Sequence, residues 1–131
     1  MTQSWCHGDL WPVNIVLRRR KLLPVVLDWE CARRDSPSGL DAVMLEIGRV
    51  KMSDGISFGE AAASMLLCGS DGRLSGVEVG GRGWREWGTV EKQAILTAAV
   101  VHYLAEKRDI PSSAWLHWCV APYLAALRGA S

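Results

Sequence analysis

Short apolar runs separated by turn residues mark the first 35 residues of the chain. Residues 15–17 and 22–27 are rich in β-branched side chains, and a basic stretch, residues 18–21, lies between them. Two such runs joined by a short polar segment predict an antiparallel β-hairpin. The basic stretch is then a solvated turn rather than a phosphate-binding patch. Pro24 has no backbone donor, so its strand should have an exposed or irregular edge there.

From about residue 38 the apolar spacing changes to that of helices. Ser38 precedes Asp41 by three residues, and Ser57 precedes Glu60 by the same interval, each just before an apolar run. This spacing is typical of a capping box, in which the two side chains bind each other's backbone N–H groups. We therefore expect two helices, the second of which ends at Gly69.

The remaining residues predict a loop and two further helices. The glycine-rich tract 69–88 has little periodicity and indicates a long loop. Apolar residues then recur at helical spacing from Thr89, the expected cap, to Lys107. The last helix should follow Ser112 and cover residues 114–127, with a kink or break at Pro122. The fold class expected is α+β, mainly α: one hairpin followed by about four helices.

Size and charge exclude several classes of protein. The chain has 131 residues, enough for one domain, and a formal net charge of +1. A nearly neutral chain argues against broad binding to nucleic acid or to an anionic membrane surface. Its apolar stretches are too short to span a bilayer and no leader opens the sequence, so a cytoplasmic protein is expected.

The cysteines give no metal signal. Cys6, Cys31, Cys68 and Cys119 are widely scattered and form no close pair. Structural zinc sites normally draw on closely spaced ligand pairs, so we expect reduced thiols rather than a zinc site.

The segment from His7 to Asn14 has the residue types and intervals of a catalytic loop. His7, Asp9 and Asn14 follow the pattern His-x-Asp, four residues, Asn that forms the catalytic loop of protein kinases. Phosphoryl transfer needs a carboxylate beside the attacking hydroxyl and oxygen ligands that hold Mg²⁺ against the phosphates. Asp28, just after the predicted hairpin, is the candidate for a further ligand.

The hairpin gives a geometric reason to group these residues. A turn centred near Lys21 would place Asn14 opposite Asp28 at the open end of the hairpin. Their amide and carboxylate oxygens suit Mg²⁺, and Asp9 would face an acceptor hydroxyl beside them. Taken singly, Asp9 could cap a turn, Asn14 could end a loop and Asp28 could be a solvated strand end. Their combination favours the site.

The strings HGDLWPVNIVL and VVLDWE resemble the catalytic and metal-binding motifs of the aminoglycoside phosphotransferase and choline kinase superfamily. These are small-molecule kinases with the protein-kinase fold, and the resemblance extends from Ser4 to about Ile47. It implies that Asp9 is the catalytic base, that His7 supports the loop, and that Asn14 and Asp28 bind Mg²⁺ and, through it, ATP or another nucleoside triphosphate. The acceptor implied is a hydroxyl group of a small molecule, whose identity the sequence does not indicate.

Two further acidic residues match the family's pattern. Asp41 corresponds to an aspartate that opens a helix after the metal motif, and the capping box explains it, so it is at most a supporting residue. Glu30 also matches, with no role beyond a polar contact at the edge of the site.

The resemblance covers only part of a kinase. Six residues precede His7, so the phosphate loop, its lysine and most of the adenine pocket are expected outside this chain. Residues 1–131 then form part of a C-terminal lobe, with the catalytic loop and metal-binding hairpin in 1–35 and the helical part in 36–131. We expect uncovered apolar surface, weak binding of Mg-ATP and little turnover without the missing lobe or a partner chain.

Three interpretations follow. The chain is part of a phosphotransferase, as a truncated copy or one piece of a split enzyme; or it is a noncatalytic binding module; or the motif is coincidental in a small helical domain. Intact Asp9, Asn14 and Asp28 favour the first, because a binding module needs no base and no metal ligands. The remaining aromatic residues and histidines are expected to be structural: Trp11, Trp29, Trp84, Trp87, Trp115, Trp118, His102 and His117.

Overall fold

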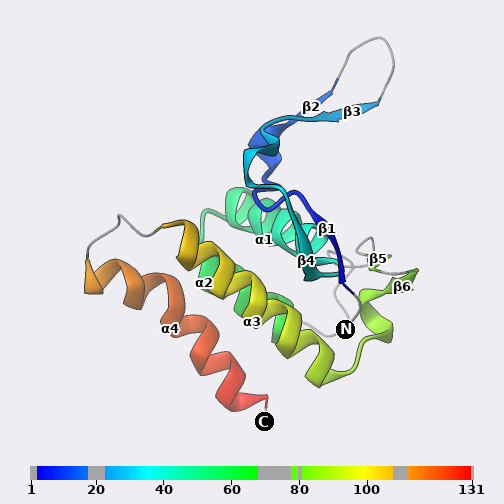
Figure 1. The fold of residues 1–131 in the computed structure, drawn as a ribbon. Coiled ribbons are helices and arrows are strands. Elements are labelled where there is room, and N and C mark those ends of the chain that lie inside the picture. The colour runs from blue at the N-terminus through cyan, green and yellow to red at the C-terminus, as the bar shows by residue number, and fades with distance from the viewer. Residues whose placement is uncertain (1–2, 18–22, 68–77, 80, 108–111, 131) are drawn as a thin grey trace.

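The computed structural model describes residues 3–17, 23–67, 78–79, 81–107 and 112–130. Within them the fold is α+β and mainly helical, as expected (Figure 1). The helices are α1 (Leu40–Asp54), α2 (Phe58–Leu67), α3 (Thr89–Glu106) and α4 (Ser113–Gly129). Three antiparallel strand pairs accompany them: β1 (Gln3–Cys6) with β4 (Arg33–Pro37), β2 (Ile15–Leu17) with β3 (Pro24–Val26), and β5 (Glu78–Val79) with β6 (Arg82–Gly83).

Helix α2 is the centre of the core. It contacts α1, α3 and α4, and most of its side chains are buried. Small residues let the neighbours approach closely: a Cβ built on Gly59 would lie 1.9 Å from the carbonyl oxygen of Cys119 on α4. Aromatic rings complete the packing, with Phe58 stacked on Tyr103 of α3 at 4.0 Å between centroids.

The capping box predicted before α2 is confirmed. The backbone N–H of Glu60 donates to Ser57 Oγ at 3.1 Å, and that of Ser57 donates to Glu60 Oε2 at 2.8 Å. Both donors would otherwise lack an intrahelical acceptor, so this reciprocal pair fixes where α2 begins.

The ends of α3 and α4 differ slightly from the prediction. The N-cap of α3 is Gly88, one residue before Thr89, and its N–H donates to the Glu91 carboxylate at 2.8 Å. Ser112 caps α4, as expected, by accepting from Trp115 N–H at 3.1 Å.

Pro122 lies inside α4 without ending it, so the predicted break is wrong. Proline removes the donor for the carbonyl four residues earlier, here that of Trp118. The helix nevertheless continues on both sides of Pro122, and Trp118 is 53% exposed.

Part of the glycine-rich tract is folded rather than looped. Its described residues form the β5–β6 pair and a 3-10 turn, Trp84–Glu86. Trp84 is buried and stacks on Trp87 at 5.9 Å, which ties this segment to the core. The loop predicted over 69–88 is therefore wrong for part of its described residues, because burial of Trp84 stabilises folded structure in spite of the glycines. The predicted helix end at Gly69 and the basic turn 18–21 lie outside the described residues.

The hairpin of β2 and β3 points away from the four helices (Figure 1). Several of its apolar side chains are uncovered, with Leu17 70% and Leu23 65% exposed. Pro24 is exposed at the first position of β3, as expected for a strand edge. In the described part of the chain, no helix has both the length and the apolar character needed to cross a membrane.

Candidate functional site

The loop after β1 is held by one carboxylate. Asp41, in the first turn of α1, accepts hydrogen bonds from His7 N–H at 2.6 Å and Gly8 N–H at 3.2 Å. Its Oδ1 also accepts from the thiol of Cys6 at 3.0 Å. Hydrogen bonds to a charged acceptor are stronger than neutral ones, so Asp41 fixes the backbone that presents Asp9.

This arrangement corrects the capping box predicted at Ser38 and Asp41. The N-cap of α1 is Gly39, with φ 90°, and no side chain caps the helix. The Asp41 carboxylate turns to the loop instead, because three donors gather there. Spacing alone cannot distinguish these partners, since both uses require an acid in the first turn of a helix.

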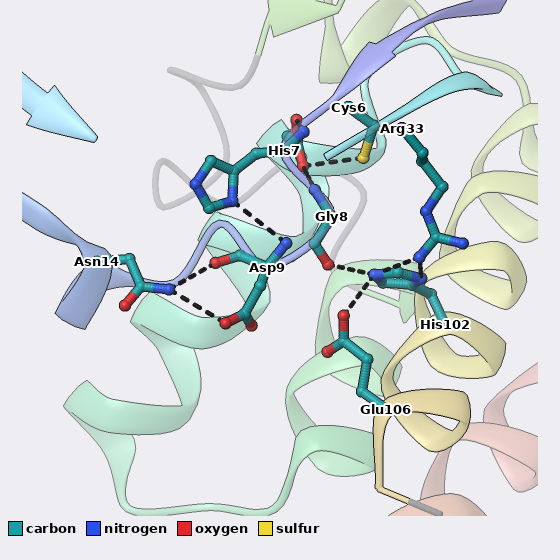
Figure 2. Close-up of polar contacts among 9 residues, drawn as sticks. Cys6, His7, Gly8, Asp9, Asn14, Arg33, His102 and Glu106 are labelled. Carbon is teal, nitrogen blue, oxygen red and sulfur yellow. Dashed lines mark hydrogen bonds and ion pairs between the residues drawn. The ribbon is translucent and has the colours of Figure 1, made fainter. Parts of the chain in front are cut away.

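Gly8 occupies a position that no other residue fits. Its φ is +84°, and a Cβ would lie 2.4 Å from the carbonyl oxygen of Cys31. Its own carbonyl accepts a hydrogen bond from His102 Nε2 of α3 (Figure 2). The chain therefore passes between the turn at Cys31 and helix α3 only because the side chain is absent.

His7 connects the loop to the segment after the hairpin. The ring is 2% exposed; Nε2 donates to the Leu27 carbonyl at 2.8 Å, and Nδ1 accepts from Asp9 N–H at 3.3 Å. The ring also packs against Trp29, 4.6 Å between centroids. One imidazole thus fixes both Asp9 and the residues on either side of Asp28, as the predicted supporting role requires.

Asp9 and Asn14 are brought together. Asn14 Nδ2 donates to the Asp9 carbonyl at 2.8 Å and to Asp9 Oδ2 at 3.1 Å (Figure 2). The 3-10 turn Pro12–Asn14 curls the chain back to make this contact. Because the amide nitrogen faces Asp9, the amide oxygen of Asn14 points away from it.

The predicted register of the hairpin is wrong by one residue. Ile15 pairs with Val26, and Leu27 N–H donates to the Asn14 carbonyl at 2.9 Å. Asn14 therefore lies opposite Leu27, and Asp28 is the next residue beyond the pair. The assumed turn centre was half a residue too late, which moves every cross-strand partner by one.

Asp28 has an unusual backbone. Its φ is 62° and ψ 66°, the left-handed region, at the start of the 3-10 turn Trp29–Cys31. A non-glycine residue there carries strain of the order of 1 kcal/mol, which persists only where the surroundings enforce it. Trp29 Nε1 donates to the Val26 carbonyl at 3.0 Å and closes the turn. Asp28 itself is exposed, at the open end of the hairpin.

A cavity of about 300 Å³ opens beside Asp9. It lies between the loop, the end of α1 and the end of α3, and its lining mixes charged, polar and aromatic side chains: Asp9, Trp11, Val13, Asn14, Lys51, Tyr103 and Lys107. Asp28 is not part of this lining. Of the predicted site residues, the structure thus gathers Asp9 and Asn14 at the cavity and leaves Asp28 outside the lining, one residue beyond the Asn14–Leu27 pair.

Two residues of the cavity, Lys51 and Lys107, were not among the predicted site residues. Lys51 is in the last turn of α1, and Lys107 is the C-cap of α3, so both match the ordinary preference for basic residues at helix C-termini. Only the packing of the two helices brings both ends to the Asp9 side of the loop. A lysine at each of two neighbouring helix ends is the one signal that could have indicated them.

The two tryptophans that flank the motif, Trp11 and Trp29, differ in their burial. Trp11 packs on Phe58 and Tyr103 at 5.9 and 5.7 Å, as expected of a structural tryptophan. Trp29 is 59% exposed, so its expected core position is wrong, because its ring covers His7 from the solvent side.

A second histidine braces the loop from behind. His102 is buried; Arg33 donates to its Nδ1 at 2.7 Å, and Glu106 Oε1 lies 2.9 Å from its Nε2 (Figure 2). Burial raises the pKa of Glu106, and the nearby charge of Asp9 raises it further. His102 is therefore satisfied structurally, as predicted, and Glu106 is a second acidic group near Asp9.

The thiol of Cys6 makes a testable contribution to stability. Burial, and then the hydrogen bond to Asp41, raise its pKa to about 11 from 9.0. A raised folded-state pKa of an acid stabilises the fold below pH 9, and this stability is lost as pH rises through 11. We expect a loss of about 2 kcal/mol between these values, absent in Cys6→Ala. Urea unfolding of both proteins at pH 8 and pH 10.5 measures it; equal slopes with pH would contradict it.

Comparison with family models, with curated proteins and with solved structures finds no match to this chain. In the described residues, no three His, Cys, Asp or Glu side chains form a metal-binding group. The protein is therefore a mainly helical α+β domain, and its candidate site lies at the loop after β1 and the neighbouring hairpin.

Proposed function

We propose that this chain is the catalytic lobe of an ATP- and Mg²⁺-dependent phosphotransferase that acts on a hydroxyl group of a small molecule. The observation that carries the proposal is the contact of Asp9 with Asn14 at the edge of a cavity, next to the strained Asp28. Strain of this kind collects at functional sites, and the spacing of His7, Asp9 and Asn14 is that of a kinase catalytic loop.

Asp9 has the position of a base. Its Oδ2 is held by Asn14 Nδ2 at 3.1 Å, and its side chain borders the cavity in which an acceptor can lie. The carboxylate would accept a hydrogen bond from the acceptor hydroxyl and take its proton as the new oxygen–phosphorus bond forms and the bond to the leaving diphosphate breaks. His7 and Asp41 are positioning residues, because they act through the backbone that holds Asp9.

Asn14 and Asp28 have the donor chemistry that Mg²⁺ requires. The amide oxygen of Asn14 faces away from Asp9, and the carboxylate of Asp28 is exposed one position beyond the Asn14–Leu27 pair. These hard oxygen donors fit Mg²⁺, which usually takes one or two protein oxygens and keeps several waters. The ion would neutralise charge on the nucleotide phosphates during transfer.

A second function, a noncatalytic binding module, is favoured by one observation. Leu17, Leu23 and Trp29 leave apolar surface uncovered on and beside the hairpin. Such a surface suits a protein contact, which could be the rest of the enzyme or an unrelated partner. The two functions differ in their need for Mg²⁺.

Mg²⁺-dependent nucleotide binding tests the proposed function. We expect the chain to bind ATP weakly, with a dissociation constant on the order of 1 mM, and only when Mg²⁺ is present. Asp28→Asn should weaken Mg²⁺-dependent binding at least about tenfold, because a ligand carboxylate is replaced by a neutral amide. Ligand-observed NMR titrations with Mg²⁺ and with EDTA measure both effects.

The matched control is Glu78→Gln on β5, an exposed acid at a distance from the hairpin (Figure 1). It makes the same carboxylate-to-amide change and should leave binding unchanged. ATP binding that ignores Mg²⁺, or equal losses in the two variants, would favour the binding module.

A further inference from the structure

Resting on the proposed function, we propose that the acceptor carries an anionic group, a phosphate or a carboxylate, which Lys51 and Lys107 bind in the cavity beside Asp9. The acceptor would thus be a small acidic hydroxyl compound rather than a cationic one. The charges that line the cavity determine which compounds the site accepts.

The cavity unites two positive side chains with one carboxylate. Lys51 approaches from the end of α1 and Lys107 from the end of α3, while Asp9 belongs to the loop between them. The lining therefore has a net positive charge even with Asp9 ionised. Two ammonium groups offer up to six donors, and oxyanions are the ligands that satisfy several such donors at once.

Lys107 also has a contact that holds it in place. Lys107 Nζ lies 5.8 Å from the centre of the Tyr103 ring, within the range of a cation–π contact. Tyr103 is itself buried and packs against Trp11, so the aromatic wall is rigid. A fixed ammonium group loses less freedom when it binds an anion than a fully solvated one.

The position of the cavity assigns the anion to the acceptor rather than to the nucleotide. Of the two proposed metal ligands, Asn14 borders the cavity and Asp28 does not. Nucleotide phosphates would lie at Asn14 and Asp28, and the acceptor on the side of Asp9. A volume of about 300 Å³ suits a compound of monosaccharide size.

The same lining disfavours cationic acceptors. An aminosugar or a quaternary amine would bring a positive charge between Lys51 and Lys107, with Asp9 as the one carboxylate in the lining to offset it. Placing like charges together in a partly enclosed site costs binding free energy, so discrimination against cations follows from the lining itself.

The test compares binding of sugars that differ in charge, without nucleotide or metal. The probes are ribose 5-phosphate and gluconate as anions, glucose as the neutral compound and glucosamine as the cation. We expect the anions to bind the wild-type chain at least about tenfold more tightly than glucose, and glucosamine to bind most weakly. Because Mg²⁺ and ATP are omitted, failure of the proposed function would leave this result readable.

Variants of the two lysines distinguish an effect on anion binding from an effect on folding. The Lys51→Gln/Lys107→Gln protein should lose the preference for anions, and Lys51→Glu/Lys107→Glu should reverse it in favour of glucosamine, which an unfolded chain would not do. Lys92→Gln is the matched control: Lys92 is on α3, about 22 Å from Lys107 along the helix, and contacts Trp84. Its preference for anions should equal that of the wild type.

Three results would overturn the proposal. They are equal affinity for anionic and neutral sugars, a preference that survives both double variants, and displacement of ribose 5-phosphate by Mg-ATP. The last would mean that the cavity holds the phosphates of the nucleotide rather than those of the acceptor.

Discussion

Replacing Asp41 by alanine should lower the free energy of unfolding by about 3 kcal/mol and remove Mg²⁺-dependent ATP binding. The substitution leaves two backbone N–H groups, those of His7 and Gly8, without their acceptor. Each unsatisfied, partly buried donor costs about 1–3 kcal/mol. The loop would also lose its attachment to α1, so Asp9 and Asn14 would no longer share one geometry. Urea unfolding and the nucleotide titration measure the two effects.

The conservative change distinguishes charge from shape. Asp41→Asn keeps one acceptor oxygen and should recover about half of the lost stability, because neutral hydrogen bonds are weaker than charged ones. Ser53→Ala, at an exposed position of the same helix, should have no effect. A loss in Asp41→Ala no larger than that in Ser53→Ala would show that the carboxylate does not hold the loop.

Gly59→Ala should destabilise the fold by at least about 3 kcal/mol. The added methyl carbon would lie 1.9 Å from the Cys119 carbonyl oxygen and 2.7 Å from its carbonyl carbon. These are backbone atoms of α4, so α2 and α4 must separate and open the core around Phe58 and Tyr123. Overpacking of this kind exceeds the usual 1–3 kcal/mol when the neighbour cannot move. Thermal and urea unfolding report the loss.

Gly83→Ala is the control for this prediction. Gly83 has φ −66° and ψ 151°, which alanine adopts readily, and nothing lies within 4 Å of the added carbon. This variant should match the wild type or exceed it slightly, because alanine restricts the unfolded chain. Similar melting temperatures for the two variants would contradict the close contact of α2 with α4.

The sequence predicted the fold well where local signals were strong. The β-branched runs specified the hairpin, and the Ser57–Glu60 pair specified the start of α2. Apolar spacing located all four helices within a few residues. Tertiary contacts decided the rest: Trp84 joins part of a glycine-rich tract to the core, and α4, which packs on α2, continues through Pro122.

In the candidate site, too, local sequence signals predicted some features, and tertiary packing determined the others. The sequence predicted that Asp9 lies beside Asn14, and the two are hydrogen-bonded, because they are five residues apart and joined by one 3-10 turn. The relation of Asn14 to Asp28 depended on the turn centre, and an error of half a residue moved Asp28 out of register. Lys51 could not be connected to Asp9 at all, since only the packing of helices brings them to one cavity.

The imidazole of His7 makes the two halves of the site mechanically dependent. Its Nδ1 accepts from the Asp9 N–H and its Nε2 donates to the Leu27 carbonyl, so one ring contacts both segments directly. A displacement of the hairpin, for example when another protein surface covers its exposed leucines, would therefore pull on Asp9 through a single rigid ring. A contact on that outer surface would in this way be transmitted to the backbone that carries the Asp9 carboxylate.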